Sequence, residues 1–341
     1  MDSILSRLLG YFTRMRSTIS RRGLLGGAAA GFAAIGLPRL VSSSAHGASA
    51  MTPASAEPSF YRFKLGAFEV TSLLDGSVTR DGPFPTYGGD QKEADVQKLM
   101  TQNFLPPTRF ESPYTPTLVN TGKELILFDT GNGPSGRDKG SGQLRSVLKE
   151  AGHGPDQIDV VVITHGHPDH IAGLMEGDAP AFPNARIVFG ALEFDYWKKG
   201  ENIPDARKNT RELFMKVAAP FGEKATFIDP GDDVVTGIRA IEAYGHSPGH
   251  LVFHVESEGQ QLLIWADTCN HFVASLQRPD WHVSFDNDHA QAAATRKKIF
   301  DMVHTDRIPV LGYHMPFPAL GYLDKHGATY HWVPASYQFR V

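Results

Sequence analysis

The segment 160–170 constrains the fold of this chain more than any other. Residues 160–163 are four consecutive apolar, β-branched residues, which is typical of a strand that is buried on both faces. Three histidines and one aspartate follow within residues 165–170. Pro168 predicts a turn after the strand, with a helix beginning just beyond it. The segment therefore predicts a strand, a turn and a helix, with polar side chains in the turn that core packing does not explain.

These side chains have the composition of a metal site. His165 and His167 are two residues apart, so in an extended segment they point to the same side. Imidazole binds zinc and neighbouring first-row metals, and a carboxylate such as Asp169 offsets part of the metal's charge. The alternative is a histidine-rich turn that binds nothing. A metal site needs further ligands elsewhere in the chain.

Such candidates lie where later predicted strands begin or end. His246 and His250 belong to the loop Gly-His-Ser-Pro-Gly-His, which leads into a predicted strand at 251–255. Asp267 and His314 each follow an apolar strand. Strand ends can meet at one edge of two sheets, so we expect these side chains to share a site with the 165–170 cluster.

The rest of the chain predicts short strands and helices in alternation, joined by turns that suit its 34 glycines and 23 prolines. We expect strands at 60–65, 68–74, 117–120, 125–128, 186–189, 234–243, 251–255, 262–265 and 308–311, and helices at 141–151, 192–198, within 205–219 and at 290–303. No internal repeat follows residue 60. We therefore expect one α+β domain over residues 60–341.

The first fifty residues differ in composition from the rest. Arg21 and Arg22 precede a mildly apolar stretch, and small residues follow at 48–50. This pattern predicts a twin-arginine signal peptide over 1–50 and a disordered leader over 51–59. We expect the twin-arginine export machinery to deliver a periplasmic or secreted protein. The stretch is too weakly apolar for stable membrane insertion, and the alternative is a disordered basic tail.

Charge and cysteine content exclude several classes of partner and site. Residues 1–50 carry six arginines and one aspartate, so the remainder has a net charge of −9 against −4 for the whole chain. An acidic protein of this kind is not expected to bind nucleic acid or anionic membranes. The single cysteine, Cys269, excludes an internal disulfide and a multi-cysteine zinc site.

Together these motifs resemble those of the metallo-β-lactamase superfamily. The resemblance rests on His-x-His-x-Asp-His at 165–170, Gly-His-Ser-Pro-Gly-His at 245–250 and the strand-end residues Asp267 and His314. It implies the αβ/βα four-layer sandwich, in which two mixed β-sheets are flanked by helices. It also implies two divalent metal ions, most plausibly zinc, although manganese, cobalt or iron suit the same ligands.

The resemblance also assigns individual residues. It implies that His165, His167 and His250 hold one metal, that Asp169, His170 and His314 hold the other, and that Asp267 bridges them. His246 is expected to support its loop without binding metal, and Asp129 to orient a ligand histidine. Asp169 and Asp267 are the carboxylates that we expect to take part in catalysis.

A closer resemblance is to the methyl parathion hydrolases, on residues 60–70, 75–76, 118–122, 128–131, the Trp197 segment and 314–318. N-acyl homoserine lactonases share the metal motifs. Asp267 argues against a true β-lactamase, because one dinuclear subclass has cysteine there and another lacks the metal-binding aspartate. Several homoserine lactonases have tyrosine at the position of Asn270. A lactonase mechanism that relies on that hydroxyl would need another donor in this chain.

We therefore expect a metal-dependent hydrolase in which a metal-bridging hydroxide attacks a neutral, hydrophobic ester. The substrate is expected to be an organophosphate triester or a lactone, with Trp197 and Phe317 lining its pocket. The alternative enzyme is a quorum-quenching N-acyl homoserine lactonase. A catalytically inactive periplasmic binding protein is disfavoured because no ligand position is missing. The resembling hydrolases also imply a homodimer.

Overall fold

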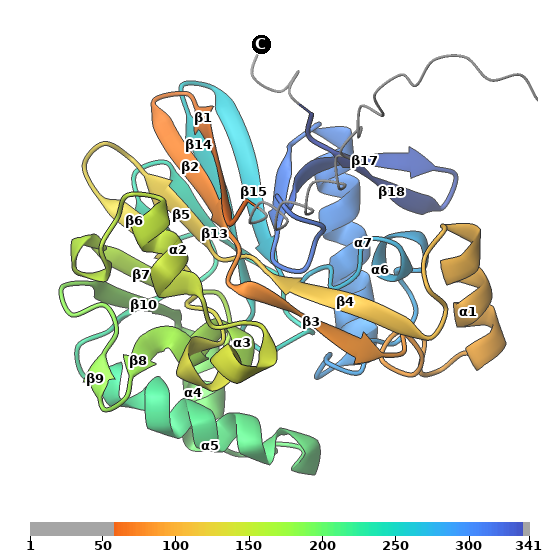
Figure 1. Cartoon of the computed structure of the whole chain (residues 1–341), viewed down its shortest axis with the longest axis horizontal. Helices are drawn as coiled ribbons and strands as arrows, with labels where there is room; N and C mark the ends of the chain where they lie inside the picture. The colour runs from red at the N-terminus through yellow and green to blue at the C-terminus, as the bar shows by residue number, and fades with distance from the viewer. Residues whose placement is uncertain (1–57, 337–341) are drawn as a thin grey trace, which may run out of the picture. The chain divides into compact units, whose positions relative to one another are not determined.

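Two seven-stranded β-sheets pack face to face at the centre of the fold (Figure 1). The computed structural model describes residues 58–336, so the expected signal peptide and residues 51–57 of the expected leader lie outside the described residues. In spatial order, the first sheet contains β1 (Phe60–Leu65), β2 (Phe68–Leu73), β5 (Thr117–Asn120), β6 (Leu125–Phe128), β7 (Val160–Ile163), β10 (Arg186–Gly190) and β11 (Thr226–Ile228).

The second sheet has the same number of strands. In spatial order they are β12 (Asp233–Val235), β13 (Ile238–Glu242), β14 (Leu251–Ser257), β15 (Gln260–Ala266), β16 (Val310–Gly312), β17 (Leu320–His326) and β18 (Thr329–Pro334). Strands β6, β7, β10 and β11 run parallel, as do β15 and β16, and the remaining pairs in both sheets are antiparallel. Both sheets are therefore mixed, as the sequence predicted.

Three apolar clusters hold the layers together. One lies between the sheets and joins side chains such as Val162 and Phe128 to Phe253 and Ile264. A second packs the outer face of the first sheet against α2 (Leu144–Glu150), α4 (Ala191–Lys199) and α5 (Lys208–Val217). The third packs the second sheet against α7 (His289–Thr305) and α6 (Ala274–Gln277). The result is the predicted four-layer sandwich (Figure 1).

Several elements lie outside the two sheets. They are the hairpin β3 (Gly76–Asp81) and β4 (Arg109–Tyr114), the hairpin β8 (Met175–Glu176) and β9 (Ala179–Pro180), and the helices α1 (Glu93–Gln102) and α3 (Pro168–Ile171). Short 3-10 turns occur at Gly133–Lys139, Pro155–Gln157, Ala172–Leu174, Asp205–Arg207 and Ala219–Phe221. Among the described residues, no helix combines the length and apolar character needed to cross a bilayer.

Most predicted elements are present, but one is wrong and several were missed. The expected single strand 234–243 is two strands, β12 and β13, because the chain reverses at Gly237, where φ is +86°. The hairpin of β3 and β4, helix α1 and the hairpin of β17 and β18 were not predicted. Strand β3 has no fully buried residue, so it lacks the apolar alternation on which a prediction depends.

Strand polarity places the candidate ligands at one edge of the sandwich. Strands β6 and β7 are parallel, so Asp129 and the 165–170 segment leave the first sheet at the same edge. Strands β15 and β16 are parallel in the second sheet, so Asp267 and His314 also leave together. Contacts between the two pairs of segments show that both edges face the same side.

Candidate metal centre

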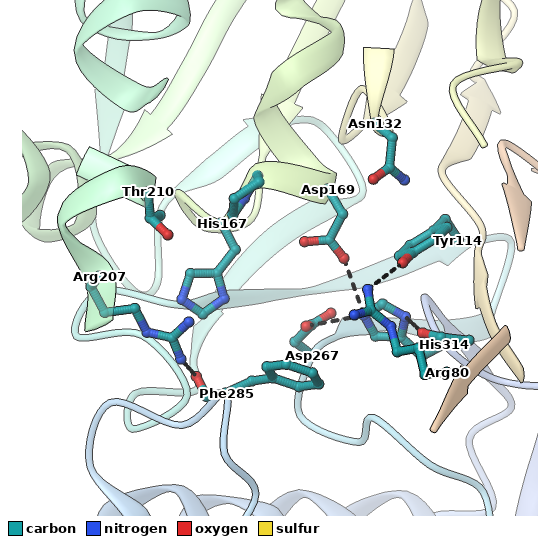
Figure 2. Close-up of a pocket in the computed structure, with 12 residues that line it drawn as sticks. Arg80, Tyr114, Asn132, His167, Asp169, Arg207, Thr210, Asp267, Phe285 and His314 are labelled. Atoms are coloured by element: carbon teal, nitrogen blue, oxygen red, sulfur yellow. Dashed lines mark hydrogen bonds and ion pairs between the residues drawn. The ribbon is translucent and has the colours of Figure 1, made fainter. Parts of the chain in front are cut away.

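The carboxylate of Asp267 lies at the centre of a buried cluster of imidazoles. Its Oδ1 is 3.2 Å from His170 Nε2, and its Oδ2 is 3.2 Å from His314 Nε2 and 3.8 Å from His165 Nε2. Asp169 Oδ2 lies 3.6 Å from His170 Nε2 and 3.5 Å from His314 Nε2. Predicted ligands from three separate segments therefore meet in one place, and Figure 2 shows His167, Asp169, Asp267 and His314 among them.

The ring nitrogens on the far side of these histidines are held by the protein. Nδ1 of His170 donates to Asp129 Oδ2 at 2.7 Å, Nδ1 of His250 to the Ala243 carbonyl at 2.9 Å, and Nδ1 of His314 to the Pro113 carbonyl at 2.9 Å. Each of these rings therefore carries its proton on Nδ1 when neutral and its lone pair on Nε2. Metal-binding histidines are usually held through their outer nitrogen in this way. In His250, Nε2 accepts from the backbone N–H of Asp267 at 3.3 Å.

The inner atoms of the cluster are those that a cation would satisfy. Nε2 of His165, His167 and His170 and Oδ1 of Asp267 are buried and have no hydrogen-bond partner among the described residues. Burial lowers the pKa of His165 well below its ordinary value and that of His250 to about 3, so both are neutral. Burial opposes ionisation of Asp267, but nearby His314 and His170 hold its pKa well below the usual range. Neutral imidazoles around carboxylates suit divalent metal ions.

His246 lies closer to the centre than the sequence suggested. Its Nε2 is 2.9 Å from His167 Nδ1 and 3.2 Å from Asp267 Oδ2, so it falls within the cluster of potential ligand atoms. Its Nδ1 donates to Asp286 Oδ1 at 2.9 Å, and Asp286 Oδ2 accepts from the fully buried Arg296 at 2.9 Å. The sequence analysis missed Asp286 and Arg296, which have no motif and come from the loop before α7 and from α7 itself.

Glu193, also missed, holds together the two loops that carry histidines. Its buried carboxylate on α4 accepts hydrogen bonds from the backbone N–H groups of Gly166, at 2.7 Å, and Gly249, at 2.8 Å. It also accepts from Trp197 Nε1 at 2.7 Å and from the Ser247 hydroxyl at 2.5 Å. The 165–170 turn and the 245–250 loop are thus fixed relative to each other through one side chain.

The glycines of the two motifs permit this arrangement. A Cβ atom on Gly249 would lie 2.2 Å from the backbone nitrogen of Glu193, and one on Gly166 would lie 2.4 Å from Trp197 Nε1. Both distances are far inside van der Waals contact. These positions therefore need glycine for close approach to α4.

Asp129 occupies the place that its predicted role requires. Besides holding His170, its carboxylate accepts from the backbone N–H and the hydroxyl of Thr164, both at 2.9 Å. Its backbone has φ +62°, a left-handed conformation that costs free energy for a residue other than glycine. The carboxylate thereby links the ends of β6 and β7 to a ligand histidine.

A cavity of about 220 Å³ opens onto the cluster. The metal-site residues on its wall are His167, Asp169, Asp267 and His314 (Figure 2). The other residues that line it are Arg80, Ser112, Tyr114, Asn132, Pro168, Arg207, Thr210 and Phe285. This lining contains two arginines, two carboxylates and several hydroxyl and amide groups, so charged groups of both signs face the cavity.

The two aromatic residues expected in the pocket lie elsewhere. Trp197 is fully buried behind His167, with 6.0 Å between their ring centroids, and it donates to Glu193. Phe317 is half-buried and is not among the residues of the cavity wall. Cys269 is fully buried, and burial raises its pKa to about 12, so its thiol is not an activated nucleophile.

Comparisons with known proteins agree with the fold. The Metallo-beta-lactamase superfamily pattern matches residues 111–309. An N-acyl homoserine lactonase of Bacillus cereus is 23% identical over 156 residues, which are 46% of this chain and 56% of that protein. The match therefore spans only about half the length of this relative. An N-acyl homoserine lactonase of Bacillus thuringiensis is 27% identical over 156 residues, with the same coverage of both chains.

Two solved structures are similar over most of the chain. One is AidC, a dizinc quorum-quenching lactonase in complex with a product, at 27% identity and a TM-score of 0.76. The similarity covers 82% of this chain and 98% of AidC. The other is the hydrolase AbOPH of the beta lactamase superfamily, at 26% identity and a TM-score of 0.75, covering 83% of this chain and 99% of that one.

The different positions of His246 and His250 lead to a test of which one binds metal. We expect His250→Ala to lower the metal content by about one ion per chain, because the resemblance assigns its imidazole to the ligand set. Metal binding would replace the hydrogen bond that its Nε2 accepts from the Asp267 backbone N–H at 3.3 Å. We expect His246→Ala to keep the stoichiometry at saturating metal but to weaken metal binding about 10- to 100-fold, as loss of a supporting residue does. Metal analysis after dialysis, with His254→Ala on β14 as control, measures both. Equal metal loss in the two variants would show that His246 is a ligand.

Glu193 gives a second prediction about the centre. In Glu193→Gln, one of the two carboxylate oxygens becomes an NH2 group, which donates. It must then face other buried donors: either the Gly249 N–H, or the Gly166 N–H and Trp197 Nε1 that now bond to Oε1. An unsatisfied buried group costs about 1–3 kcal/mol, so we expect a lower melting temperature and metal affinity reduced about tenfold. Glu212→Gln, on the exposed side of α5, is the matched control. Wild-type metal affinity in Glu193→Gln would contradict the proposed role of the carboxylate.

Proposed function

The chain belongs to the metallo-beta-lactamase superfamily, and we propose that within it this protein is a dinuclear metal-dependent hydrolase that opens lactones. The observation that supports this most is the convergence of His165, Asp267 and His314 with their neighbouring ligands beside a cavity. Similarity to N-acyl homoserine lactonases and to a dizinc lactonase favours a lactone over other esters. Lactonase relatives and ligand geometry thus point to the same chemistry.

In the proposed site, His165, His167 and His250 would hold one ion, and Asp169, His170 and His314 would hold the other, with the Asp267 carboxylate available to both. Bound divalent metals supply Lewis-acid polarisation of a carbonyl group and activation of water. The protein's contribution is to keep the ligands in position. Asp129 fixes His170, the Ala243 carbonyl fixes His250, and Asn270 Nδ2 donates to Asp267 Oδ2 at 2.9 Å.

Asn270, which holds the central carboxylate, stands where several homoserine lactonases have tyrosine. The hydroxyl donor that this tyrosine would supply must therefore come from another residue of this chain. Tyr114, from β4, brings a phenol into the same cavity, and Arg80 Nη2 donates to its oxygen at 2.9 Å. Arginine has no acceptor, so the phenol proton stays available to another group. Burial raises the pKa of Tyr114, which keeps it protonated. We infer that Tyr114 donates to the leaving alkoxide.

An organophosphate triester is the second candidate. It is favoured by the resemblance to methyl parathion hydrolases, but of the residues that carry this resemblance only His314 lines the cavity. The resemblance otherwise concerns strands such as β1 and β2 and the turns of the framework. We also propose export by the twin-arginine pathway, on residues 1–50, and a homodimer, on the resembling hydrolases; neither bears on the substrate.

A substrate panel on metal-analysed protein tests the proposed activity. We expect kcat/KM for γ- and δ-lactones and for N-hexanoyl homoserine lactone to exceed that for methyl parathion at least 100-fold. We expect activity to disappear after chelation, to return with added metal, and to be absent in Asp267→Ala. A triester rate equal to the lactone rate would favour the second candidate, and full activity after chelation would reject both.

Tyr114→Phe tests the inferred proton donor. We expect kcat on aliphatic lactones to fall about 100-fold, the lower range for loss of a general acid. An ester with a nitrophenolate leaving group needs no proton, so its kcat should fall much less. Tyr61→Phe, on β1 in the first sheet, is the control. Equal losses on both types of substrate would show that Tyr114 acts only through the structure of the pocket.

A further inference from the structure

The cavity has a second polar wall that the proposed chemistry does not use. Arg207 ends the turn Asp205–Arg207, and Thr210 lies in the first turn of α5. Both line the cavity together with Phe285. In Figure 2, Arg207 lies beside His167, on the opposite side of the Asp169 and Asp267 carboxylates from Arg80. The two arginines therefore face the metal site from two sides.

Arg207 is a half-buried cation without a carboxylate partner among the described residues. Its Nη2 donates to the carbonyls of Ser284, at 3.4 Å, and Phe285, at 2.5 Å. Asp286 is close enough to act on it electrostatically, but that carboxylate already accepts from His246 and Arg296. Partial burial lowers the pKa of Arg207 below its usual value, although Asp286 and Asp169 act in the opposite direction.

Thr210 adds a hydroxyl group at the same wall. The residue is 7% exposed, and it lines the cavity. Figure 2 shows the side chain directed into the cavity between Arg207 and His167. Its hydroxyl is therefore available to a group bound in the cavity. An arginine and a hydroxyl that share one wall form a common receptor for oxyanions.

The charge of the whole site favours the same kind of ligand. With two divalent ions bound, Asp169 and Asp267 offset only part of the metal charge, and Arg80 and Arg207 add to the excess. A pocket of this sign raises the local concentration of anions and disfavours cations. A neutral, hydrophobic substrate would leave both arginines without an anionic partner.

We propose that Arg207 and Thr210 form a subsite for a negatively charged group of the substrate, a carboxylate or a phosphate, so that the preferred lactone is an anion. This inference rests on the proposed lactonase function, and it replaces the neutral substrate expected from the sequence. The other role open to Arg207 is structural, because its bonds to two carbonyls hold residues 284–285 against the turn before α5. A structural role would affect all substrates alike, whereas a subsite affects charged ones.

Matched substrates separate these two roles. The probes are γ-butyrolactone with a carboxylate on the ring, the same lactone with a carboxamide, and a lactone with a phosphomonoester side chain. We expect the wild-type protein to prefer an anionic lactone over the carboxamide at least tenfold in kcat/KM. Whichever anion is preferred identifies the charged group. No preference, or a preference for the carboxamide, would overturn the proposal.

Substitution of Arg207 completes the test. We expect Arg207→Gln to reduce the preference for the anion to about twofold or less, mainly through KM, and Arg207→Lys to restore part of it. Thr210→Val should reduce it by a smaller factor. Arg211→Gln is the matched control, because Arg211 lies one turn further along, in α5, is not on the cavity wall and donates to the Lys198 carbonyl. Equal losses on charged and neutral lactones in Arg207→Gln would overturn the subsite and leave the lactonase function standing.

A binding measurement keeps the subsite testable if no lactone is hydrolysed. Calorimetric titration of the metal-loaded protein with glutarate, a dicarboxylate, measures anion binding without turnover. We expect Arg207→Gln to raise the Kd for glutarate about tenfold relative to wild type and to Arg211→Gln. Failure of hydrolysis with this difference present would reject the proposed function and support the subsite. An unchanged Kd would reject the subsite.

Discussion

The ionised carboxylate of Asp267 is the constraint on which the rest of the site depends. A carboxylate that is only 3% exposed is costly to ionise unless positive or hydrogen-bonding groups surround it. Those groups are imidazoles from the end of β7, from the 245–250 loop and from the end of β16, all within about 4 Å of its oxygens. These imidazoles meet only if the two sheets pack with their ligand-bearing edges on the same side. The geometry of the site therefore depends directly on how the two sheets pack.

Three further buried acids keep the ligand-bearing segments in register. Asp129 joins the ends of β6 and β7 to His170, Glu193 joins the 165–170 turn to the 245–250 loop, and Asp286 joins His246 to Arg296 on α7. Each lies one residue layer behind the imidazoles and accepts several hydrogen bonds. Hydrogen bonds to charged acceptors contribute about 1.5–3 kcal/mol each, and breaking one side of such a network leaves the other side buried without a partner. Positional precision at the centre therefore comes from this outer layer.

The cavity walls are built differently from its floor. The floor consists of ligands at strand ends of the common framework, whereas Arg80, Tyr114 and Arg207 come from the β3–β4 hairpin and from the turn before α5. These segments lie outside the two sheets, and β4 also reaches the centre, because its Pro113 carbonyl holds His314. The wall therefore contains two arginines and a tyrosine from these segments, where the sequence had led us to expect Trp197 and Phe317.

From the sequence alone, most of the framework and most of the side chains that gather around Asp267 could be predicted. The apolar run at 160–163, the spacing of His165 and His167, and the loop around His250 are local patterns, and local patterns reflect strand burial and ligand geometry directly. The pocket could not be predicted in this way. Trp197 has the side chain of a pocket residue but packs behind His167, because Glu193 accepts its N–H; Arg207 and Tyr114 have no motif and are about ninety residues apart. Which side chains face a cavity is decided by how distant segments pack against one another, and only the tertiary structure contains that information.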